Sequence, residues 1–319
     1  MPVSSATNLL IFWAFPFFII TMLLEWKLAP HVYRLKDTFA NLSLGLGQVI
    51  LSLFTKVFLW AIYAKTFDWF HQDFLSGQLK SIDLTMIFDP IVSWTIALLV
   101  MDCAYYFFHR YSHEIHCLWS AHVVHHQSEE YNLSVALRQS WFQHIYSGIF
   151  YLPLAIFMPL EQFLLANLIN TLGQYWIHTK LIDRIGSLEY ILNTPSHHRV
   201  HHATNEKYLD KNYAGILIIW DRIFGTFEAE DPSEEIKYGV LRPLHSFNPF
   251  WANFQIPFVL YEQTKAVCAQ KTTMWIKCKQ IYYVFFRKPS WFDMQWQAQG
   301  QESQGQESQG LKVKGNQDE

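Results

Sequence analysis

The sequence predicts an all-α membrane protein, a multi-pass helical bundle carrying a histidine-rich two-metal cap on its cytoplasmic side. Half of the 319 residues are hydrophobic (51%) and 17% are aromatic. The apolar residues gather in stretches near the 20 or so residues that cross a bilayer as a helix. Ten of the fifteen histidines lie in two short stretches, residues 109–126 and 195–208. This clustering predicts a metal site built at the helix ends.

The first apolar stretch covers residues 2–24, carries no charge, and is closed by Glu25 and Lys27. A cleaved signal peptide has basic residues before its apolar core and a small-residue cleavage site after it. Neither is present around this stretch. We therefore expect a retained membrane anchor.

Two further stretches complete the predicted spans, residues 42–64 and residues 90–108. The earlier one is interrupted by Lys56, which would either snorkel to the interface, pair inside the bundle, or mark a shallower span. The later one runs directly into His109, so its helix should deliver that side chain to one end of the bundle.

Two shorter apolar runs follow, residues 145–160 and 162–177. At 1.5 Å per residue each helix would reach about 24 Å, short of the roughly 30 Å hydrocarbon core. We expect a helical hairpin that crosses only in part and whose two ends return to one side. His144 and His178 would then lie beside the other histidines.

The loops between the predicted spans differ in basic residues. The loop at residues 25–41 holds three Lys or Arg residues, whereas that at residues 65–83 holds two. Because cytoplasmic loops are enriched in Lys and Arg, the first loop is predicted to be cytoplasmic. The metal site would lie on the same side.

The histidines fall into three blocks, one His-x-x-x-His and two His-x-x-His-His. The blocks are His109 and His113; His122, His125 and His126; and His198, His201 and His202. Residues three and four apart share one face of a helix, so each block can direct its imidazoles into one small volume. Eight imidazoles exceed the four to six or so ligands of one transition-metal ion, which indicates two ions.

The types of ligand residue exclude some kinds of metal site but do not identify the metal. No two cysteines form a Cys-x-x-Cys pair, which argues against a zinc ribbon or an iron–sulfur cluster. Imidazole suits iron, copper, zinc or nickel. Scattered surface histidines, a metal transporter and a structural zinc site are the alternatives, and none of them explains three ordered blocks at helix ends.

Polar residues near the blocks are candidates for supporting roles. Asn167, Asn170, Gln174 and His178 form a stripe at helical spacing, and His178 is expected to be a ninth ligand. Asn170 and Gln174 would either bond between helices or lie beside the site and its substrate channel. Asp102, two turns before His109, would either orient a ligand imidazole or pair with Lys or Arg.

The chain divides into four predicted segments. These are N-terminal transmembrane helices (1–89), a catalytic domain (90–235), a C-terminal membrane-associated segment (236–295) and a disordered tail (296–319). Within the third segment, residues 251–292 are rich in aromatic and basic residues and are expected at the membrane interface. The tail repeats QESQG twice and cannot bury a core.

The histidine blocks and their order resemble the fatty acid hydroxylase and sterol desaturase superfamily of membrane di-iron oxygenases. Within it, AHVVHHQSEEYNLSVALRQS, LEYILNTPSHHRVHH and DKNYAGILIIWDRIFGTFEAE look most like the alkylglycerol monooxygenase family. The resemblance implies nine iron ligands, His109, His113, His122, His125, His126, His178, His198, His201 and His202. It leaves His197 as a supporting or substrate-facing residue.

The resemblance also implies the reaction and the partners. Two irons would hydroxylate a lipid C–H bond with O2, here cleaving the ether bond of an alkylglycerol to fatty aldehyde and glycerol. A sterol desaturase, a fatty acid hydroxylase and a non-catalytic metal-binding membrane protein are the alternatives. The electron donor would be tetrahydrobiopterin, cytochrome b5 or a bacterial redox partner, and no nucleic acid is expected. The membrane would be the endoplasmic reticulum in a eukaryote or the inner membrane in a bacterium.

Overall fold

The computed structural model describes residues 3–74, 85 and 88–289. These residues form helices and turns and no β-strand; two isolated bridges, Leu192 with Leu217 and Ala203 with Tyr238, are their only extended pairings. The prediction of an all-α fold is confirmed for this part of the chain. The predicted disordered tail at 296–319 lies outside the described residues.

Among the described residues, three helices are long and apolar enough to cross a membrane: α1 (Val3–Leu28), α2 (Leu35–Asp68) and α4 (Pro90–Glu114). Helices α2 and α4 contain their predicted apolar stretches and extend beyond them, and α1 covers the first stretch from Val3 onward and continues to Leu28. The start of α4 is set by Asp89, whose carboxylate accepts hydrogen bonds from the first free backbone amides, and by Pro90 at the first helical position. The end of α4 lies past both of its block histidines.

The predicted hairpin after the second block is present but shorter than expected. It consists of α6 (Gln143–Tyr151), a 3-10 turn η4 (Leu152–Ile156) and α7 (Leu160–Gly173). Helix α7 packs against α1 and α4, and α6 against α2 and α4. Neither helix is among the candidate spans.

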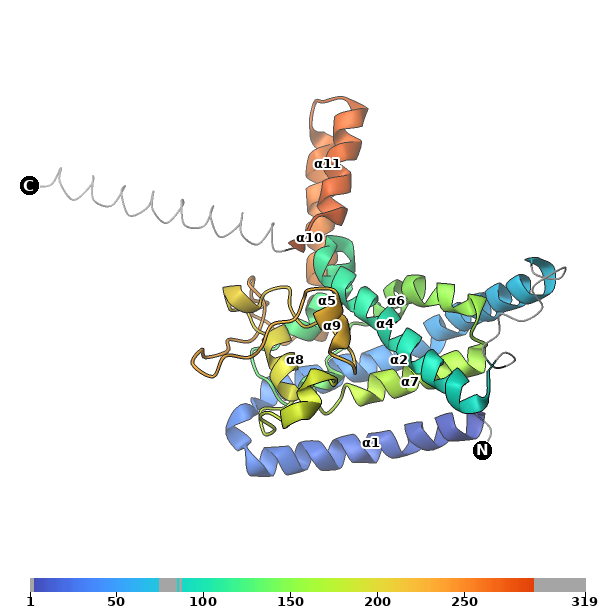
Figure 1. Cartoon of the computed structure of the whole chain (residues 1–319). Helices are drawn as coiled ribbons and strands as arrows, with labels where there is room; N and C mark the ends of the chain where they lie inside the picture. The colour runs from blue at the N-terminus through green and yellow to red at the C-terminus, as the bar shows by residue number, and fades with distance from the viewer. Residues whose placement is uncertain (1–2, 75–84, 86–87, 290–319) are drawn as a thin grey trace, which may run out of the picture.

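Short elements form a cap at one end of these helices (Figure 1). The cap contains α5 (His116–His126), η3 (Leu133–Leu137), η5 (Gly186–Tyr190), α8 (Pro195–His201), η6 (Glu206–Tyr208) and α9 (Ile219–Ile223). Glu25, buried at the end of α1, ties the cap to the bundle. Its carboxylate accepts hydrogen bonds from the Leu133 amide (2.8 Å) and the Thr179 hydroxyl.

The last described helices, α10 (Pro249–Ala269) and α11 (Met274–Phe286), pair as a hairpin that projects from the cap (Figure 1). The hairpin runs across the direction of α1 and α2. Two further short elements lie in the part of the chain that the structure describes: η1 (Pro30–Val32) after α1 and the short π-helix η2 (Trp69–Phe74) after α2.

Candidate metal centre

Nine buried or half-buried histidines from four parts of the chain come together where the cap meets the end of α4. They form two groups, and within each group one nitrogen per ring lies within 4.8 Å of all the others. The first group is His109, His113, His122, His126 and His201. The second group is His125, His178, His198 and His202. The same nine residues were predicted as ligands, and each group can hold a metal ion.

The two groups divide the sequence blocks between them. His125 and His126 are neighbours in the chain but lie in different groups, as do His201 and His202. Successive residues of a helix point about 100° apart, so one turn can serve two adjacent ions. The groups adjoin, since the rings of His126 and His202 stack with centroids 4.3 Å apart.

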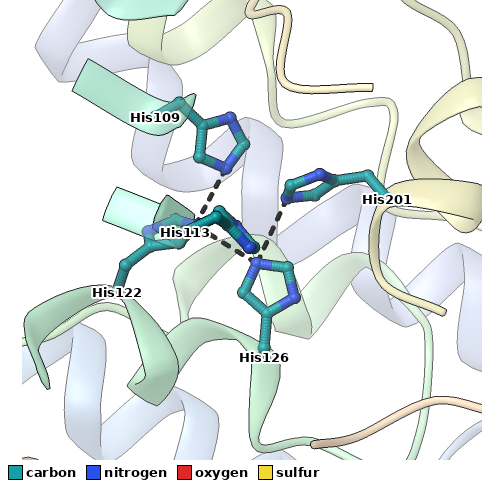
Figure 2. Close-up of side chains that lie close together, drawn as sticks. All are labelled: His109, His113, His122, His126 and His201. Atoms are coloured by element: carbon teal, nitrogen blue, oxygen red, sulfur yellow. Dashed lines mark hydrogen bonds between the residues drawn. The ribbon is translucent and has the colours of Figure 1, made fainter. Parts of the chain in front are cut away.

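In the five-histidine group the imidazoles converge through their Nε2 atoms (Figure 2). The Nε2 of His122 lies 2.8 Å from that of His109 and 3.2 Å from that of His126. The Nε2 of His201 lies 3.2 Å from that of His126. His113 presents a buried Nε2 that has no hydrogen-bond partner, as a nitrogen reserved for a metal would.

The four-histidine group has the same construction. The Nε2 of His178 lies 3.2 Å from that of His125 and 3.0 Å from that of His198. The Nε2 of His202 lies 3.2 Å from that of His198. Each of the four rings therefore directs its Nε2 toward a common centre.

Backbone carbonyls hold the opposite ring nitrogens of four histidines. His109 Nδ1 lies 2.7 Å from the Tyr213 carbonyl oxygen, and His125 Nδ1 lies 2.9 Å from that of Arg138. His178 Nδ1 and His201 Nδ1 each lie 2.9 Å from a carbonyl oxygen, that of Gln174 and that of Lys211, respectively. A carbonyl only accepts, so each Nδ1 carries the proton and each Nε2 is left with a lone pair. Such bonds orient metal-binding imidazoles and raise their basicity.

Two of these lone pairs face one another without a proton between them. His125 and His178 both donate from Nδ1, yet their Nε2 atoms are 3.2 Å apart. Burial lowers the pKa of His125 to about 4 and the pKa of His178 well below its ordinary value, so both rings are neutral near pH 7. Facing lone pairs repel, and a cation between them removes the repulsion.

The donor spacing fits a transition metal. An imidazole nitrogen binds such an ion at roughly 2.1 Å, so two ligands at a right angle would be about 3.0 Å apart, and two at a tetrahedral angle about 3.4 Å apart. The six Nε2 separations range from 2.8 to 3.2 Å. These separations are closer to the right-angle value, which is that of neighbouring ligands around an ion with more than four coordination positions.

The structure corrects the role predicted for Asp102. Its buried carboxylate accepts hydrogen bonds from the backbone amides of Ile216 (2.8 Å) and Leu217 (3.0 Å), from Trp220 Nε1 (2.9 Å) and from Asn170 Nδ2 (2.6 Å). Among the described contacts, neither a histidine nor a Lys or Arg is a partner. Asp102 instead fastens the loop before α9 to α4 and α7.

The side chains of Asn170 and Gln174 also bond away from the two histidine groups. The Gln174 amide donates to Asn170 Oδ1 (2.8 Å), and only the Gln174 backbone carbonyl reaches His178. The loop lies so close to Asp102 that Gly215 is required, because a Cβ there would be 2.7 Å from Asp102 Oδ1. The stripe packs between helices, which leaves its proposed channel role without support from these contacts.

Two of the six histidines outside both groups were singled out from the sequence, His144 and His197. His197 is buried, with Nδ1 3.3 Å from the Thr194 hydroxyl and Nε2 3.9 Å from Glu189 Oε2. Burial lowers its pKa to about 4. His144, which we expected beside the blocks, is in neither group of described residues.

Arg138 and Tyr213 are supporting residues that the histidine spacing did not indicate. Arg138 is buried, donates to the Val124 carbonyl (2.6 Å) and to Asn41 Oδ1 (2.9 Å), and offers its own carbonyl to His125. Tyr213 places its ring 5.3 Å from that of His113, and its amide bonds to a buried aspartate. Both lie within the sequence stretches that resemble alkylglycerol monooxygenases, and that resemblance was the one signal that could have indicated them.

The chain is similar in sequence to proteins of known family. The family model for fatty acid hydroxylase matches residues 94–226. Human alkylglycerol monooxygenase is 41% identical over 285 residues, which cover 87% of this chain and 59% of the human protein. The zebrafish (Danio rerio) alkylglycerol monooxygenase is 43% identical over 76% of this chain and 52% of its own length.

A bacterial relative matches more distantly. Ornithine lipid hydroxylase OlsE of Rhizobium tropici is 28% identical over 41% of this chain and 40% of its own length. No solved structure matches. The chain spans between half and three fifths of the length of the alkylglycerol monooxygenases compared here. Residues 94–226 thus match the fatty acid hydroxylase model, and the chain is similar to alkylglycerol monooxygenases over most of its own length.

Proposed function

We propose that this chain is a membrane di-iron monooxygenase that hydroxylates a lipid C–H bond with O2, its substrate being an alkylglycerol. The observation that carries the proposal is the pair of adjoining imidazole groups at the end of the candidate spans. The likeness to alkylglycerol monooxygenases supports the substrate class. The metal centre would face the cytoplasm, in the endoplasmic reticulum of a eukaryote or the inner membrane of a bacterium.

The nine histidines would hold one iron in each group. When bound, the irons supply O2 activation and the oxidising power for C–H cleavage. The protein keeps the imidazoles neutral and pointed inward: their surroundings are buried, and backbone carbonyls fix the proton of four rings on Nδ1. Burial also keeps water from the reacting carbon.

In the proposed reaction the two atoms of O2 go to the substrate and to water. One oxygen atom enters the C–H bond beside the ether oxygen, and the other leaves as water after a donor supplies two electrons and two protons. The resulting hemiacetal breaks its C–O bond to give fatty aldehyde and glycerol. We propose a tetrahydropterin as the donor, with cytochrome b5 or another redox partner as the alternatives.

Hydroxylation of an acyl lipid is a second candidate, favoured by the match to an ornithine lipid hydroxylase. Both reactions need an alkyl chain brought from the bilayer to the metal groups. Helices α1, α2 and α4 each have one end beside the cap, so a lipid held among them would have its reacting end near the centre. The two candidates differ in the headgroup that must be recognised.

The test uses membranes that contain the full chain. They are supplied with labelled 1-O-alkylglycerol, reduced pterin and O2, and fatty aldehyde is measured alongside the metal content of the purified protein. We expect aldehyde and about two irons per chain, no aldehyde from His125→Ala, and full activity from His31→Ala, which alters an exposed histidine. Turnover of an acyl lipid alone would favour the second candidate, and zinc without oxygen consumption would refute both.

A further inference from the structure

The α10–α11 hairpin carries a charge opposite in sign to that of the whole chain. Residues 249–288 contain six Lys or Arg residues and one acidic residue, a net charge of +5, whereas the whole chain carries −3. The basic residues are Lys265, Lys271, Lys277, Lys279, Arg287 and Lys288. A concentrated positive charge of this kind favours an anionic partner.

Aromatic side chains form an exposed stripe along α10. Phe250, Phe254, Phe258 and Tyr261 recur at spacings of four, four and three residues, so they share one face of the helix. They are 63%, 45%, 52% and 60% exposed. Lys265 continues the stripe, with its Nζ 6.0 Å from the centre of the Tyr261 ring. Exposed aromatic surface of this extent marks an interaction site.

Helix α11 repeats the arrangement. Trp275, Lys279, Tyr282 and Phe286 are spaced by four, three and four residues and are all exposed. The rings of Tyr282 and Phe286 stack, with centroids 4.9 Å apart. Both helices of the hairpin therefore present aromatic rings together with lysines.

The direction of the hairpin relative to the candidate spans indicates how it would lie against a bilayer. It runs across α1 and α2 (Figure 1), so if those helices cross a bilayer the hairpin lies along the bilayer surface. Its stripe begins beside the bundle, since the Phe250 ring lies 5.0 Å from that of Trp141 and a Cβ at Gly47 of α2 would touch Trp141. Helix α10 is also too polar to be a candidate span.

We infer that the α10–α11 hairpin is an interfacial element that docks on the anionic surface of the bilayer in which α1, α2 and α4 lie. Aromatic rings prefer the headgroup region, and flanking lysines extend to lipid phosphates while their stems cover apolar surface. This inference is independent of the proposed reaction. It concerns where the hairpin lies, whatever chemistry the metal groups perform.

The hairpin is joined to the metal-bearing part of the cap. His116, the first residue of α5, lies with Nδ1 3.1 Å from the Val284 carbonyl, and the Gln127 amide donates to the Ala252 carbonyl (3.4 Å). The docked hairpin would therefore hold both ends of the helix that supplies three of the nine histidines.

The test places a nitroxide label at Phe258→Cys or Tyr282→Cys in the full chain, with the four native cysteines changed to serine. A label at Glu206→Cys, exposed on the cap, is the matched control. The protein is reconstituted in nanodiscs of phosphatidylcholine with phosphatidylglycerol. Collision of each label with O2, which concentrates in lipid, is compared with collision with a water-soluble nickel chelate.

We expect the labels at 258 and 282 to meet O2 far more often than nickel, and the label at 206 to show the reverse. Equal nickel access at all three positions would overturn the inference. Protection of 258 from both reagents would also overturn it, because it indicates burial against a second copy of the chain. If the serine background does not fold, the exposed native cysteines of the hairpin, Cys268 on α10 and Cys278 on α11, carry the label instead.

A charge variant tests the anionic requirement. Lys271→Glu with Lys279→Glu should lower the docked fraction, since each lysine near an anionic surface contributes roughly fivefold to the partition. Lys237→Glu, an exposed lysine of the cap, should leave the accessibility at 258 unchanged. An unchanged profile in the hairpin variant would refute the lipid assignment, and iron content serves as the folding check for each protein.

Discussion

The metal centre and the α10–α11 hairpin depart from the usual distribution of side chains in opposite ways. The centre encloses nine polar imidazoles, eight buried and one half-buried, whereas the hairpin exposes aromatic rings. Buried polar groups are costly without partners, and large exposed apolar surfaces are uncommon on a free protein surface. Each departure indicates something the polypeptide does not itself provide: a cation in the centre, and a lipid surface for the hairpin.

The largest expected effect is the loss of turnover and bound metal when a histidine of either group is removed. His122→Ala and His198→Ala each remove one donor from a different group and should abolish turnover, with loss of about half of the bound metal. Metal analysis of the purified variants measures this. His197→Ala is the matched control, since that buried histidine lies in neither group; loss of metal there would mean that the ligands are misassigned.

Metal removal tests the facing lone pairs directly. Chelation should lower the midpoint of thermal unfolding by roughly 10 °C, because the ion binds the folded chain only and offsets repulsion between nitrogens about 3 Å apart. Differential scanning measurements in detergent follow the change, and added Fe²⁺ should restore the midpoint. The hairpin charge variant should show the same shift on chelation as the wild-type chain.

Asp102→Asn should destabilise the fold by about 2 kcal/mol, because an amide cannot accept all four hydrogen bonds and leaves a buried donor unpaired. The folded fraction should keep its full metal content, since Asp102 contacts no histidine among the described residues. Thermal unfolding and metal analysis on the same sample distinguish the two effects. Metal loss from fully folded protein would restore a ligand-orienting role.

Gln174→Ala should have the smallest effect. Only the backbone carbonyl of Gln174 reaches His178, and alanine keeps that carbonyl. We expect under about 1 kcal/mol of destabilisation from the lost side-chain bonds, with metal content unchanged. A large loss of turnover at full metal content would instead show that the amide contacts substrate, which can be measured as a rise in KM.

Much of this arrangement was predictable because helical spacing is a local property. The apolar stretches predicted α1, α2 and α4, and the spacing within the three blocks predicted convergence of eight rings. The polar stripe and the family resemblance added His178, and the structure brings these nine rings together. The predicted hairpin was too long, since α6 ends at Tyr151 and gives way to a 3-10 turn around Pro153. His144 lies at the start of the same short helix and in neither histidine group of the described residues.

The sequence by itself determined which residues can serve as donors and which stretches can enter lipid, since both depend on side-chain type and on spacing within one helix. Only the tertiary structure decided the division into groups of five and four, the carbonyls that orient the rings, and the partners of Asp102. His109 and the Tyr213 carbonyl are 104 residues apart, and Asp102 and Leu217 are 115 apart. Such pairs are chosen by how distant segments pack, which no local pattern encodes.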